Sequence, residues 1–511
     1  MSMTDYSRPR GDITTVLDLT DRDSQDNTYF PLDTDNSWFH RESNRTVYPT
    51  AMSVQEFPQR GPAEWGQMFS FEIGSLPAGD LLQAVMLQVK LGSWYNGDIL
   101  QKIASGDITT NTMEYSSEYW TYMNSLGTAI VEYADFVVGD QTIERITGEF
   151  IRAFFNVYSD VNTLIGISSD AIGAVPVQYL SPPYVNQTEL NPNRPYPTED
   201  GTLFCILPFF FLRTRLSEVF PLLSCSEGSV RIDVKLRPFD QVVRRYLGYR
   251  PNCEATPLNQ TVSFNVVDPA SILTTTTFDY VPKFRDFRIV TCCALTDGTL
   301  RDKFIRNPFE QMVKLVQTFH FEEPLKYLVS KPHPNSDTVE IQLPLELNHP
   351  VIELLWVFRR KAVLINNEWT NFTPSIGLET NPNKVYPAWL EYATIRLNGI
   401  ELISADGNWF REHIGSVHRG GLITYNSYVY GYSFANYPDE HQPSGTANMS
   451  KTTSVTMNLK VRTPIPKDLA TLDPPCVFDP NTTGGWEVFV YAIHYNWLRF
   501  ENGICNRMFT D

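Results

Sequence analysis

The repeated alternation of apolar and polar residues constrains this chain more than any other feature. Every second residue from Val455 to Val461 is apolar, and the residues between them are polar or charged. Residues 229–237 and 339–348 follow the same pattern. Because a period of two places neighbouring side chains on opposite faces of a strand, each segment is predicted to be a β-strand with one buried face. Pro344 lies on the outward-facing parity, which indicates an edge or bulged strand.

Turn residues divide the segment 397–462 into a hairpin, a loop and a strand. The dipeptide Asn398-Gly399 tolerates the positive φ angles of a type I′ hairpin turn better than most. Further along, Pro438, Pro443 and Gly445 lie close together, which excludes a helix and predicts an ordered loop.

Helical spacing is convincing at one place only. Phe309, Met312, Val313 and Val316 recur at helical intervals after Pro308, and proline is favoured in the first turn of a helix. We therefore expect one short helix here and strands through most of the rest of the chain.

The length of the chain predicts two domains. Its 511 residues exceed the roughly 250 to 300 at which a single core stops growing. A polar segment with proline favours a linker at 251–260, between a first domain at 27–250 and a second at 261–511. Residues 1–26 are rich in aspartate and are expected to form a flexible acidic arm. That arm is either a frayed terminus or a contact with a neighbouring subunit.

Charge and cysteine content exclude several partners. A net charge of −17 argues against direct nucleic-acid binding, which needs lysine and arginine to neutralise phosphates. The seven cysteines have neither a CxxC pair nor a zinc-like spacing, so a reducing compartment is expected. No apolar stretch approaches the 18 or more residues of a membrane span, and we expect a soluble chain.

The sequence contains no recognisable catalytic constellation. Motifs for nucleotide binding, serine hydrolysis and zinc proteolysis are missing. His413 and His418 have no third ligand nearby and are interpreted as hydrogen-bonding loop residues. Glu132 and Asp135 could form a catalytic pair, but a carboxylate held by backbone or arginine is commoner. The aromatic-rich loop at 409–432 could bind carbohydrate, although packing beneath a surface loop is favoured. We predict no catalytic residue, no cofactor and no metal.

Three strings of residues point to a known family. They are LNHPVIELLWVFR at 347–359, SFANYPDEHQPSGTANMS at 433–450 and YNWLRF at 495–500, accompanied by the Asn-Gly turn and a Trp-Phe-Arg block. These strings resemble the major capsid proteins of the nucleocytoplasmic large DNA viruses of eukaryotes. The resemblance spans residues 37–499, and the acidic arm and the ending ICNRMFTD depart from it. The signature residues, to which we assign a structural role, are Asn348, His349, Pro350, Asn398, Gly399, Trp409, Phe410, Arg411, Phe434, Pro438, Glu440, His441, Gln442, Pro443, Ser444, Gly445, Asn496 and Arg499.

The resemblance, together with the alternating strands, predicts an all-β fold. It implies two consecutive eight-stranded antiparallel jelly rolls, with long inter-strand loops and few short helices. It further implies a structural subunit of an icosahedral virus shell that self-associates into a pseudo-hexagonal trimeric capsomer. The implied partners are neighbouring capsomers and minor capsid and penton proteins. An inner membrane would lie beneath the shell without being spanned, and no nucleic acid would be contacted. The expected location is the virion capsid, after synthesis and assembly in host cytoplasm.

A second class of function stays open at this point. A jelly-roll carbohydrate-binding protein or glycoside-active enzyme would share the fold, but it should show clustered carboxylates beside exposed aromatic residues. A stable trimer in solution favours the shell protein, and a monomer favours the enzyme.

Overall fold

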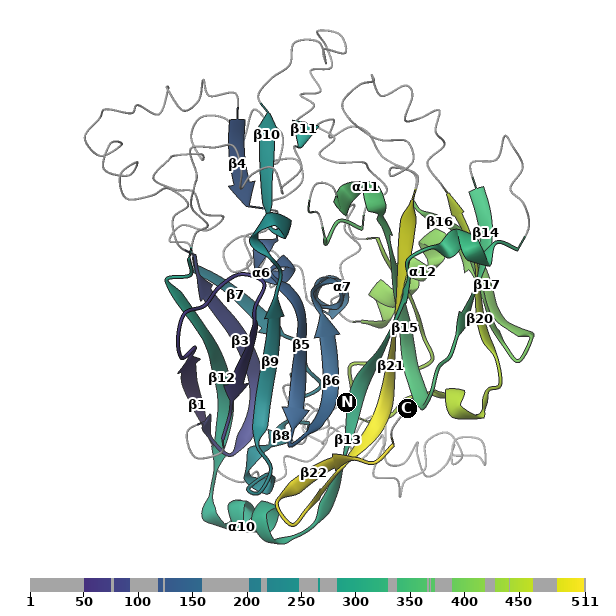
Figure 1. The fold of residues 1–511 in the computed structure, drawn as a ribbon. Coiled ribbons are helices and arrows are strands. Elements are labelled where there is room, and N and C mark those ends of the chain that lie inside the picture. Colours follow the sequence, from purple (N-terminus) through teal and green to yellow (C-terminus); the bar gives the residue numbers. More distant parts are fainter. Residues whose placement is uncertain are drawn as a thin grey trace, which may run out of the picture. The chain divides into compact units, whose positions relative to one another are not determined.

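Antiparallel strands are the main elements in the described part of the computed structural model (Figure 1). The residues that it describes are 50–74, 78–91, 118–122, 125–158, 202–212, 218–247, 265–266, 283–329, 338–364, 367, 369–372, 388–418, 428–440, 442–462 and 485–509. All strand pairings among these residues are antiparallel.

Eight strands of the first half form two four-membered sheets. The first sheet has the order β1 (Thr50–Pro58), β12 (Asp286–Thr296), β3 (Leu81–Lys90) and β7 (Thr202–Leu207), and the short β8 (Phe220–Pro221) also pairs with β3. The second sheet has the order β2 (Met68–Glu72), β9 (Val230–Leu236), β5 (Val131–Val138) and β6 (Gln141–Thr147).

The second half repeats this arrangement. One sheet has the order β13 (Phe309–Phe321), β21 (Trp486–Glu501), β15 (Pro350–Arg360) and β18 (Val429–Ser433), with β19 (Ala447–Asn448) on β15 and β22 (Ile504–Arg507) on β21. The other has the order β14 (Thr338–Leu345), β20 (Val455–Arg462), β16 (Leu390–Leu397) and β17 (Ile400–Asp406).

Both halves therefore follow one topology. Within each half, counted in chain order, the first, eighth, third and sixth of the eight strands form one sheet, and the second, seventh, fourth and fifth form the other. This is the double Greek-key order of an eight-stranded jelly roll. The predicted fold of two consecutive eight-stranded antiparallel jelly rolls is confirmed.

The remaining elements lie in the connections. A small separate sheet contains β11 (Asn265–Val266), β10 (Val243–Leu247) and β4 (Glu118–Tyr122). The α-helices of the described residues are α6 (Leu126–Ala129), α7 (Gly148–Tyr158), α10 (Gly298–Arg306), α11 (Lys361–Leu364) and α12 (Gly407–Val417). Short 3₁₀ turns are η4 (Leu222–Ser224), η5 (Phe239–Gln241), η8 (Pro324–Tyr327) and η9 (Met449–Lys451).

The alternating segments form the predicted strands. In β20, residues of one parity from Val455 to Val461 are buried and the others are half-buried. Its partner β14 buries alternate residues in the same way. Pro344 lies on β14, which is the edge strand of its sheet, so its missing N–H breaks no interior ladder. The pattern of period two thus predicted both strand and edge position correctly.

The predicted helix at 309–316 is wrong. Residues 309–321 form β13, which pairs along its full length with β21, and the helix of this region is α10, just upstream. Pro308 precedes the strand instead of opening a helix. Half-buried apolar residues on both faces of β13 produced an accidental helical spacing, and pairing with a long central strand overrode it.

The strand β12 corrects the predicted assignment of residues 261–511 to the second jelly roll. It pairs with β1 and with β3, so it is the eighth strand of the first jelly roll. The proposed linker 251–260 and the arm 1–26 lie outside the described residues. Residues Thr50–Asp511 belong to one compact unit, and a single hydrophobic core includes residues of both jelly rolls, such as Phe136 and Trp356.

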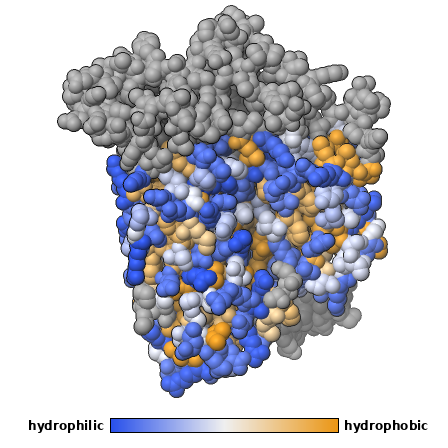
Figure 2. Space-filling view, viewed as in Figure 1, coloured by the Kyte–Doolittle hydropathy of each residue, from blue (hydrophilic) through white to orange (hydrophobic). Residues whose placement is uncertain are grey.

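On the face that Figure 2 shows, the described part is mostly hydrophilic, with local hydrophobic patches. One patch lies at the upper right, near the place of β14 in Figure 1. The exposed large apolar side chains of the described part include Leu325 in η8 and Val329 just after it. No helix in the described ranges is long and apolar enough to cross a bilayer.

Candidate functional site

Helix α7, which connects β6 to β7, carries contacts between the two jelly rolls. At its start, the Thr147 hydroxyl accepts a hydrogen bond from the Phe150 N–H at 3.3 Å. A side chain at Gly148 would collide with the backbone oxygens of Thr128 and Val131. Glycine at this position therefore lets α7 begin directly against the start of β5.

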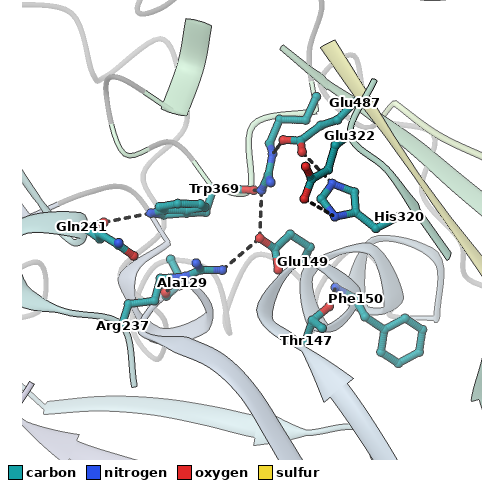
Figure 3. A network of polar contacts seen from close by, with 11 residues as sticks. Ala129, Thr147, Glu149, Phe150, Arg237, Gln241, His320, Glu322, Trp369 and Glu487 are labelled. Atoms are coloured by element: carbon teal, nitrogen blue, oxygen red, sulfur yellow. Dashed lines mark hydrogen bonds and ion pairs between the residues drawn. The ribbon is translucent and has the colours of Figure 1, made fainter. Parts of the chain in front are cut away.

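The second residue of the helix, Glu149, is held by arginines from both jelly rolls (Figure 3). Its Oε1 accepts a hydrogen bond from Arg237, just after β9, at 2.9 Å and one from Arg359 on β15, also at 2.9 Å. All three side chains are at least nine-tenths buried. A carboxylate of the first jelly roll is thus neutralised in part by a cation of the second.

The network continues into the second jelly roll. Arg359 Nε donates to Glu487 on β21 at 2.6 Å, and Glu487 also bonds the ring of His320 at 2.7 Å. Trp369 lies beside both arginines and donates its indole N–H to the carbonyl of Gln241 at 2.9 Å (Figure 3). Two carboxylates are therefore matched by two guanidinium groups, with a histidine at the outer end.

The electrostatics keep the carboxylates ionised. Burial alone would raise the pKa of Glu149, but the charges of Arg237 and Arg359 bring it below its ordinary value. For Glu487, burial is likewise outweighed by hydrogen bonds and charge from His320 and Arg359, so its pKa is also lowered. Burial alone would lower the pKa of Arg359, but the two carboxylates raise it. Glu149, Glu487 and Arg359 therefore stay charged across physiological pH.

Aromatic packing extends the junction along α7. The ring of Phe150 lies 5.1 Å from that of Tyr491 on β21, centroid to centroid, and both side chains are buried. At the end of the helix, Tyr158 stacks on Phe154 at 4.2 Å. The Tyr158 hydroxyl donates to Glu353 on β15. Both ends of α7 thus contact the second jelly roll.

A histidine links that end of α7 to the loop at 433–450, which we call the signature loop. His418, the residue after α12, contacts the Tyr158 ring at 4.2 Å. Its Nε2 bonds Glu353 and its Nδ1 bonds Asp439, both at 2.8 Å. Burial alone would lower the pKa of His418, but Glu353 and Asp439 raise it to about 9. The imidazolium therefore bridges two carboxylates, and the predicted hydrogen-bonding role of this histidine is confirmed.

Much of the signature loop is fixed by a buried lysine. Lys314 on β13 donates its ammonium group to the carbonyls of Pro438 at 2.6 Å and Glu440 at 2.8 Å. Within the loop, the Ser444 hydroxyl accepts from the Tyr437 N–H at 2.8 Å. Gly445 has φ +153°, and a side chain there would collide with the carbonyl of Phe434. The sequence of the loop is thus explained by its anchoring to β13 and by close backbone contacts.

The Asn398-Gly399 pair forms the predicted turn. Both residues have positive φ, 52° and 79°, and they connect β16 to β17. The Asn398 side-chain oxygen accepts hydrogen bonds from the N–H of Thr453 at 2.8 Å and of Ser454 at 3.2 Å. The turn therefore also holds the segment that leads into β20.

The Trp-Phe-Arg block lies on α12, and residues 429–432 belong to β18, so the prediction of a loop through 409–432 is wrong at both ends. Phe410 is buried and packs edge-on against Trp356, whereas Trp409 is 37% exposed. The Arg411 guanidinium lies over the ring of Tyr428 at 4.7 Å. His413 stacks on Trp409 and accepts from the Ser433 N–H at 3.3 Å. A helix outcompetes the loop because Phe410 and Ile414 form one buried face.

The remaining signature residues lie in connections and at the last long strand. Backbone groups of His349 bond Ser450 and Met449, and Pro350 is the first residue of β15. The side chain of Asn496 is buried and donates to the carbonyl of Phe509 at 2.9 Å. The Asn348 N–H donates to the side chain of Gln317, and Arg499 forms an exposed ion pair with Glu501. Gln442 and Pro443 are exposed. His441 lies outside the described residues.

The contacts of this site join the two jelly rolls and anchor the signature loop, which is a structural role. Asp135, considered above as half of a catalytic pair, accepts hydrogen bonds from Nε and Nη2 of Arg145, both at 2.7 Å, the more common arrangement. No group of three possible metal ligands occurs among the described residues. The sequence analysis missed Glu149, Arg237, Arg359 and Glu487 altogether. The available signal was a charged residue inside an apolar run, as at Arg359 after LLWVF.

Comparisons with known proteins agree with this architecture. Residues 301–506 match the family described as large eukaryotic DNA virus major capsid protein. Residues 37–275 match the family described as major capsid protein N-terminus. The two matches cover most of both jelly rolls.

Individual relatives match over shorter stretches. The major capsid protein of Pyramimonas orientalis virus is 26% identical over 179 residues, which are 33% of this chain and 38% of that protein. The major capsid protein of Phaeocystis pouchetii virus is 33% identical over 113 residues, which are 22% of this chain and 19% of that protein. The aligned stretches thus span well under half of these relatives.

Solved structures share the fold over nearly the whole chain. A quasi-atomic model of the PBCV-1 virus capsid superposes with a TM-score of 0.61 at 17% identity, covering 93% of this chain and all of that one. The Faustovirus major capsid protein gives a TM-score of 0.56 at 12% identity, covering 91% and 93%. With both halves matched in sequence and the paired jelly rolls matched in fold, the chain belongs to the family of large eukaryotic DNA virus major capsid proteins.

Proposed function

We propose that this protein is the structural subunit of an icosahedral virus shell and that three copies form a pseudo-hexagonal capsomer. Family membership and the double jelly roll support a capsid role. The observation that carries the trimer is the internal repeat. A chain that contains the same unit twice, joined at a defined junction, can repeat that junction between copies and close a ring.

Helices α7 and α12 are the corresponding parts of the two units. Each connects the fifth strand of its jelly roll to the sixth. Each starts with a glycine whose side chain would collide with a carbonyl at or near the start of the fourth strand, Val131 for Gly148 and Leu390 for Gly407. The sequences GEFIR and GNWFR align from these glycines.

The contact positions differ in exposure. In α7, Glu149 and Phe150 are buried against the second jelly roll. The corresponding residues of α12, Asn408 and Trp409, are exposed. We infer that α12 docks on the first jelly roll of a second copy, so that Trp409 does between chains what Phe150 does within one. Alternating junctions of the two kinds join six jelly rolls in three chains.

The first jelly roll offers an apolar surface that fits this role. Its edge strand β1 exposes Met52 and Val54, at 57% and 62%, and Leu295 of the adjacent β12 is 42% exposed. Burial of such side chains on association contributes roughly 25 cal/mol per Å². The aromatic ring of Trp409 is the kind of anchor that dominates protein interfaces.

Light scattering after size exclusion tests the proposal on the full chain. The wild type is expected to elute as a trimer, and Trp409→Ala is expected to shift it to monomer at the same concentration. Trp497→Ala is the matched control, because Trp497 is equally exposed, at 39%, but lies on β21 away from α12. A monomeric wild type contradicts the shell function and favours the carbohydrate-active alternative. A Trp409→Ala variant that stays trimeric contradicts the role of α12.

The other assignments complete the proposal. The chain has no enzymatic activity and does not contact nucleic acid directly. Its partners are neighbouring capsomers, minor capsid and penton proteins, with an inner membrane beneath the shell that it does not span. It is made and assembled in host cytoplasm. The first jelly roll runs through β12 to Thr296, α10 forms the connection, and the second begins at Phe309.

The acidic arm at 1–26 is proposed to act only between capsomers. Its six aspartates and lack of apolar surface fit a segment that orders against a neighbour and adds little to either core. Deleting it is expected to leave the trimer intact by light scattering and to change the salt dependence of particle formation. Loss of the trimer on deletion contradicts this assignment.

A further inference from the structure

We propose that Cys225 and Cys505 are a redox site, whose oxidation forms a disulfide between the two jelly rolls. This inference goes beyond the capsid function and does not depend on it. Cys225 directly follows η4 in the first jelly roll, and Cys505 lies on β22 in the second. A bond between them closes a loop through most of the C-terminal half of the chain.

The backbone brings these two cysteines together. The hairpin of β21 and β22 turns at Asn502 and Gly503, which both have positive φ. The Gly503 carbonyl accepts a hydrogen bond from the Glu227 N–H at 3.1 Å. A side chain at Gly503 would lie 2.6 Å from the Ser226 hydroxyl. The hairpin tip is therefore pressed against the residues that follow Cys225.

The two thiols are neighbours, since Cys505 is two residues from Gly503 and Cys225 is two residues from Glu227, which are hydrogen-bonded to each other. Both residues are buried and reduced in this structure. The other free cysteines among the described residues, Cys205, Cys292 and Cys293, lie on strands of the first jelly roll. Within the described part of the chain, this pair is the one that can cross-link the two halves.

The chemistry needs a disulfide oxidant, such as oxidised glutathione. One cysteine loses its proton and attacks a sulfur of the oxidant, which releases one reduced thiol and leaves a mixed disulfide. The second cysteine then attacks the protein sulfur of that mixed disulfide and releases the other thiol. Two protons and two electrons leave the protein, and one S–S bond replaces two S–H bonds.

The surroundings of Cys505 predict that the pair is oxidised slowly and only in the presence of a disulfide oxidant. A surface pocket of about 540 Å³ is lined by Gly139, Gln141, Gly228, Cys505 and Arg507, so a small oxidant can approach. The hydrogen bond with Cys225 and burial raise the pKa of Cys505, which keeps its thiolate scarce at neutral pH. The pair is therefore expected to stay reduced in a reducing compartment and to oxidise on long exposure outside one.

Peptide mapping of the full chain tests the site directly. The protein is incubated with oxidised glutathione or with a reductant, free thiols are alkylated, and digests are analysed by mass spectrometry. We expect a linked peptide pair containing Cys225 and Cys505 in the oxidised sample and its absence in the reduced one. The oxidised protein is also expected to unfold at a midpoint several degrees higher, because the cross-link restricts the unfolded chain.

Variants separate this site from general thiol chemistry. Cys505→Ser is expected to abolish the linked peptide and the rise in unfolding midpoint, whereas Cys292→Ser keeps both. The wild-type mapping needs no variant, so a folding defect in Cys505→Ser leaves the main test intact. The proposal is overturned if Cys225 and Cys505 are both recovered alkylated after the half-buried Cys292 has been fully oxidised.

Discussion

Helices α7 and α12 begin in the same way and end at the same place, yet their outer faces differ. Each starts on a glycine packed against the preceding sheet, with a buried apolar residue at its fourth position, Ile151 in α7 and Phe410 in α12. Their C-terminal ends meet, because Tyr158 of α7 contacts His418, the cap of α12. Between these points, α7 presents a buried carboxylate, and α12 presents a neutral amide and an indole to solvent.

With α12 docked on a second copy, as proposed above, the difference follows from when each helix meets its partner. The partner of α7 belongs to the same chain, so the arginine that neutralises Glu149 is present whenever the chain is folded. Burying an ion pair costs desolvation that only a well-placed partner offsets. A helix that must stay soluble until a second copy arrives does better with Asn408 and Trp409, which tolerate both water and an interface. The charged junction suits a permanent contact and the aromatic one an assembled contact.

Breaking the charged junction should give the largest effect. In Arg359→Met, the apolar stem of the side chain is kept, but Glu149 and Glu487 lose a shared cation inside the core. Removing one partner of a buried ion pair typically costs about 3 to 5 kcal/mol. We expect a loss of this size in the free energy of unfolding from urea denaturation.

The double replacement of Arg359→Met with Glu149→Gln is the matched control. Because it removes one charge of each sign, it should recover part of the loss, which a double-mutant cycle measures as coupling. If the losses of the single variants Arg359→Met and Glu149→Gln add up to the loss of the double variant, Glu149 and Arg359 do not act as a pair and the junction is held by packing alone.

Truncating the third residue of each helix should separate the two junctions. Phe150→Ala removes a buried ring that packs on Tyr491, and a loss of about 3 to 4 kcal/mol is expected in the stability of the monomer. Trp409→Ala removes a ring that is 37% exposed, so its loss is expected to stay below about 1 kcal/mol. The trimer should respond in the opposite order, with Trp409→Ala dissociating it at concentrations where a folded Phe150→Ala variant still associates. Equal losses of monomer stability would mean that α12 packs on its own chain as tightly as α7 does.

His418, which lies where the two helices end, should make the stability of the protein depend on pH. The pKa of His418 is raised to about 9 in the folded protein by Glu353 and Asp439, against about 6.5 in an unfolded chain. The charged form therefore stabilises the fold fully below pH ~6.5, and this contribution is lost as the pH rises through about 9. A shift of this size corresponds to up to about 3 kcal/mol.

Urea denaturation at pH 6, 7.5 and 9 measures this dependence. His418→Gln keeps a hydrogen-bonding group without a titrating one, so its stability should change less across the same range. If the wild type and the variant have the same pH slope, the imidazolium between Glu353 and Asp439 does not contribute as described.

The features that were predicted correctly from the sequence depend on residues that are close together in the chain. The alternation in β14 and β20, the edge position of Pro344 and the turn at Asn398-Gly399 each depend on residues close in the chain. The assignment of β12 could not be made in this way, because an apolar strand can join either sheet. Its pairing with β3, some two hundred residues earlier, decides the matter.

The junction was missed for a similar reason. Glu149, Arg237 and Arg359 are far apart in sequence, and only Arg359, which follows an apolar run, differs there from an ordinary surface charge. Only the packing of α7 between the jelly rolls makes them one site. The helix at Gly407–Val417 was missed because its aromatic residues favour strands by propensity. Its helical pattern is also weak, since only Gly407, Phe410 and Ile414 are buried.

The hairpins that precede the two helices offer the finest comparison. In the second jelly roll both Asn398 and Gly399 have positive φ, which fits type I′, whereas in the first only Gly139 does, which fits type II′. Neither glycine has an atom near the position of an added side chain, so a substitution meets backbone strain alone. Gly399→Val and Gly139→Val should each lower stability by about 1 to 3 kcal/mol, while the surface change Lys460→Gln should alter it by less than about 0.5 kcal/mol. Thermal midpoints of the three variants measure this, and equal midpoints for Gly399→Val and Lys460→Gln would count against the type I′ turn. Of the two glycine variants, Gly139→Val is expected to lose more stability. The Gly139 N–H donates to the carbonyl of Ser229 at 2.7 Å, so strain at this turn reaches the strand that leads to Arg237 and the junction at α7.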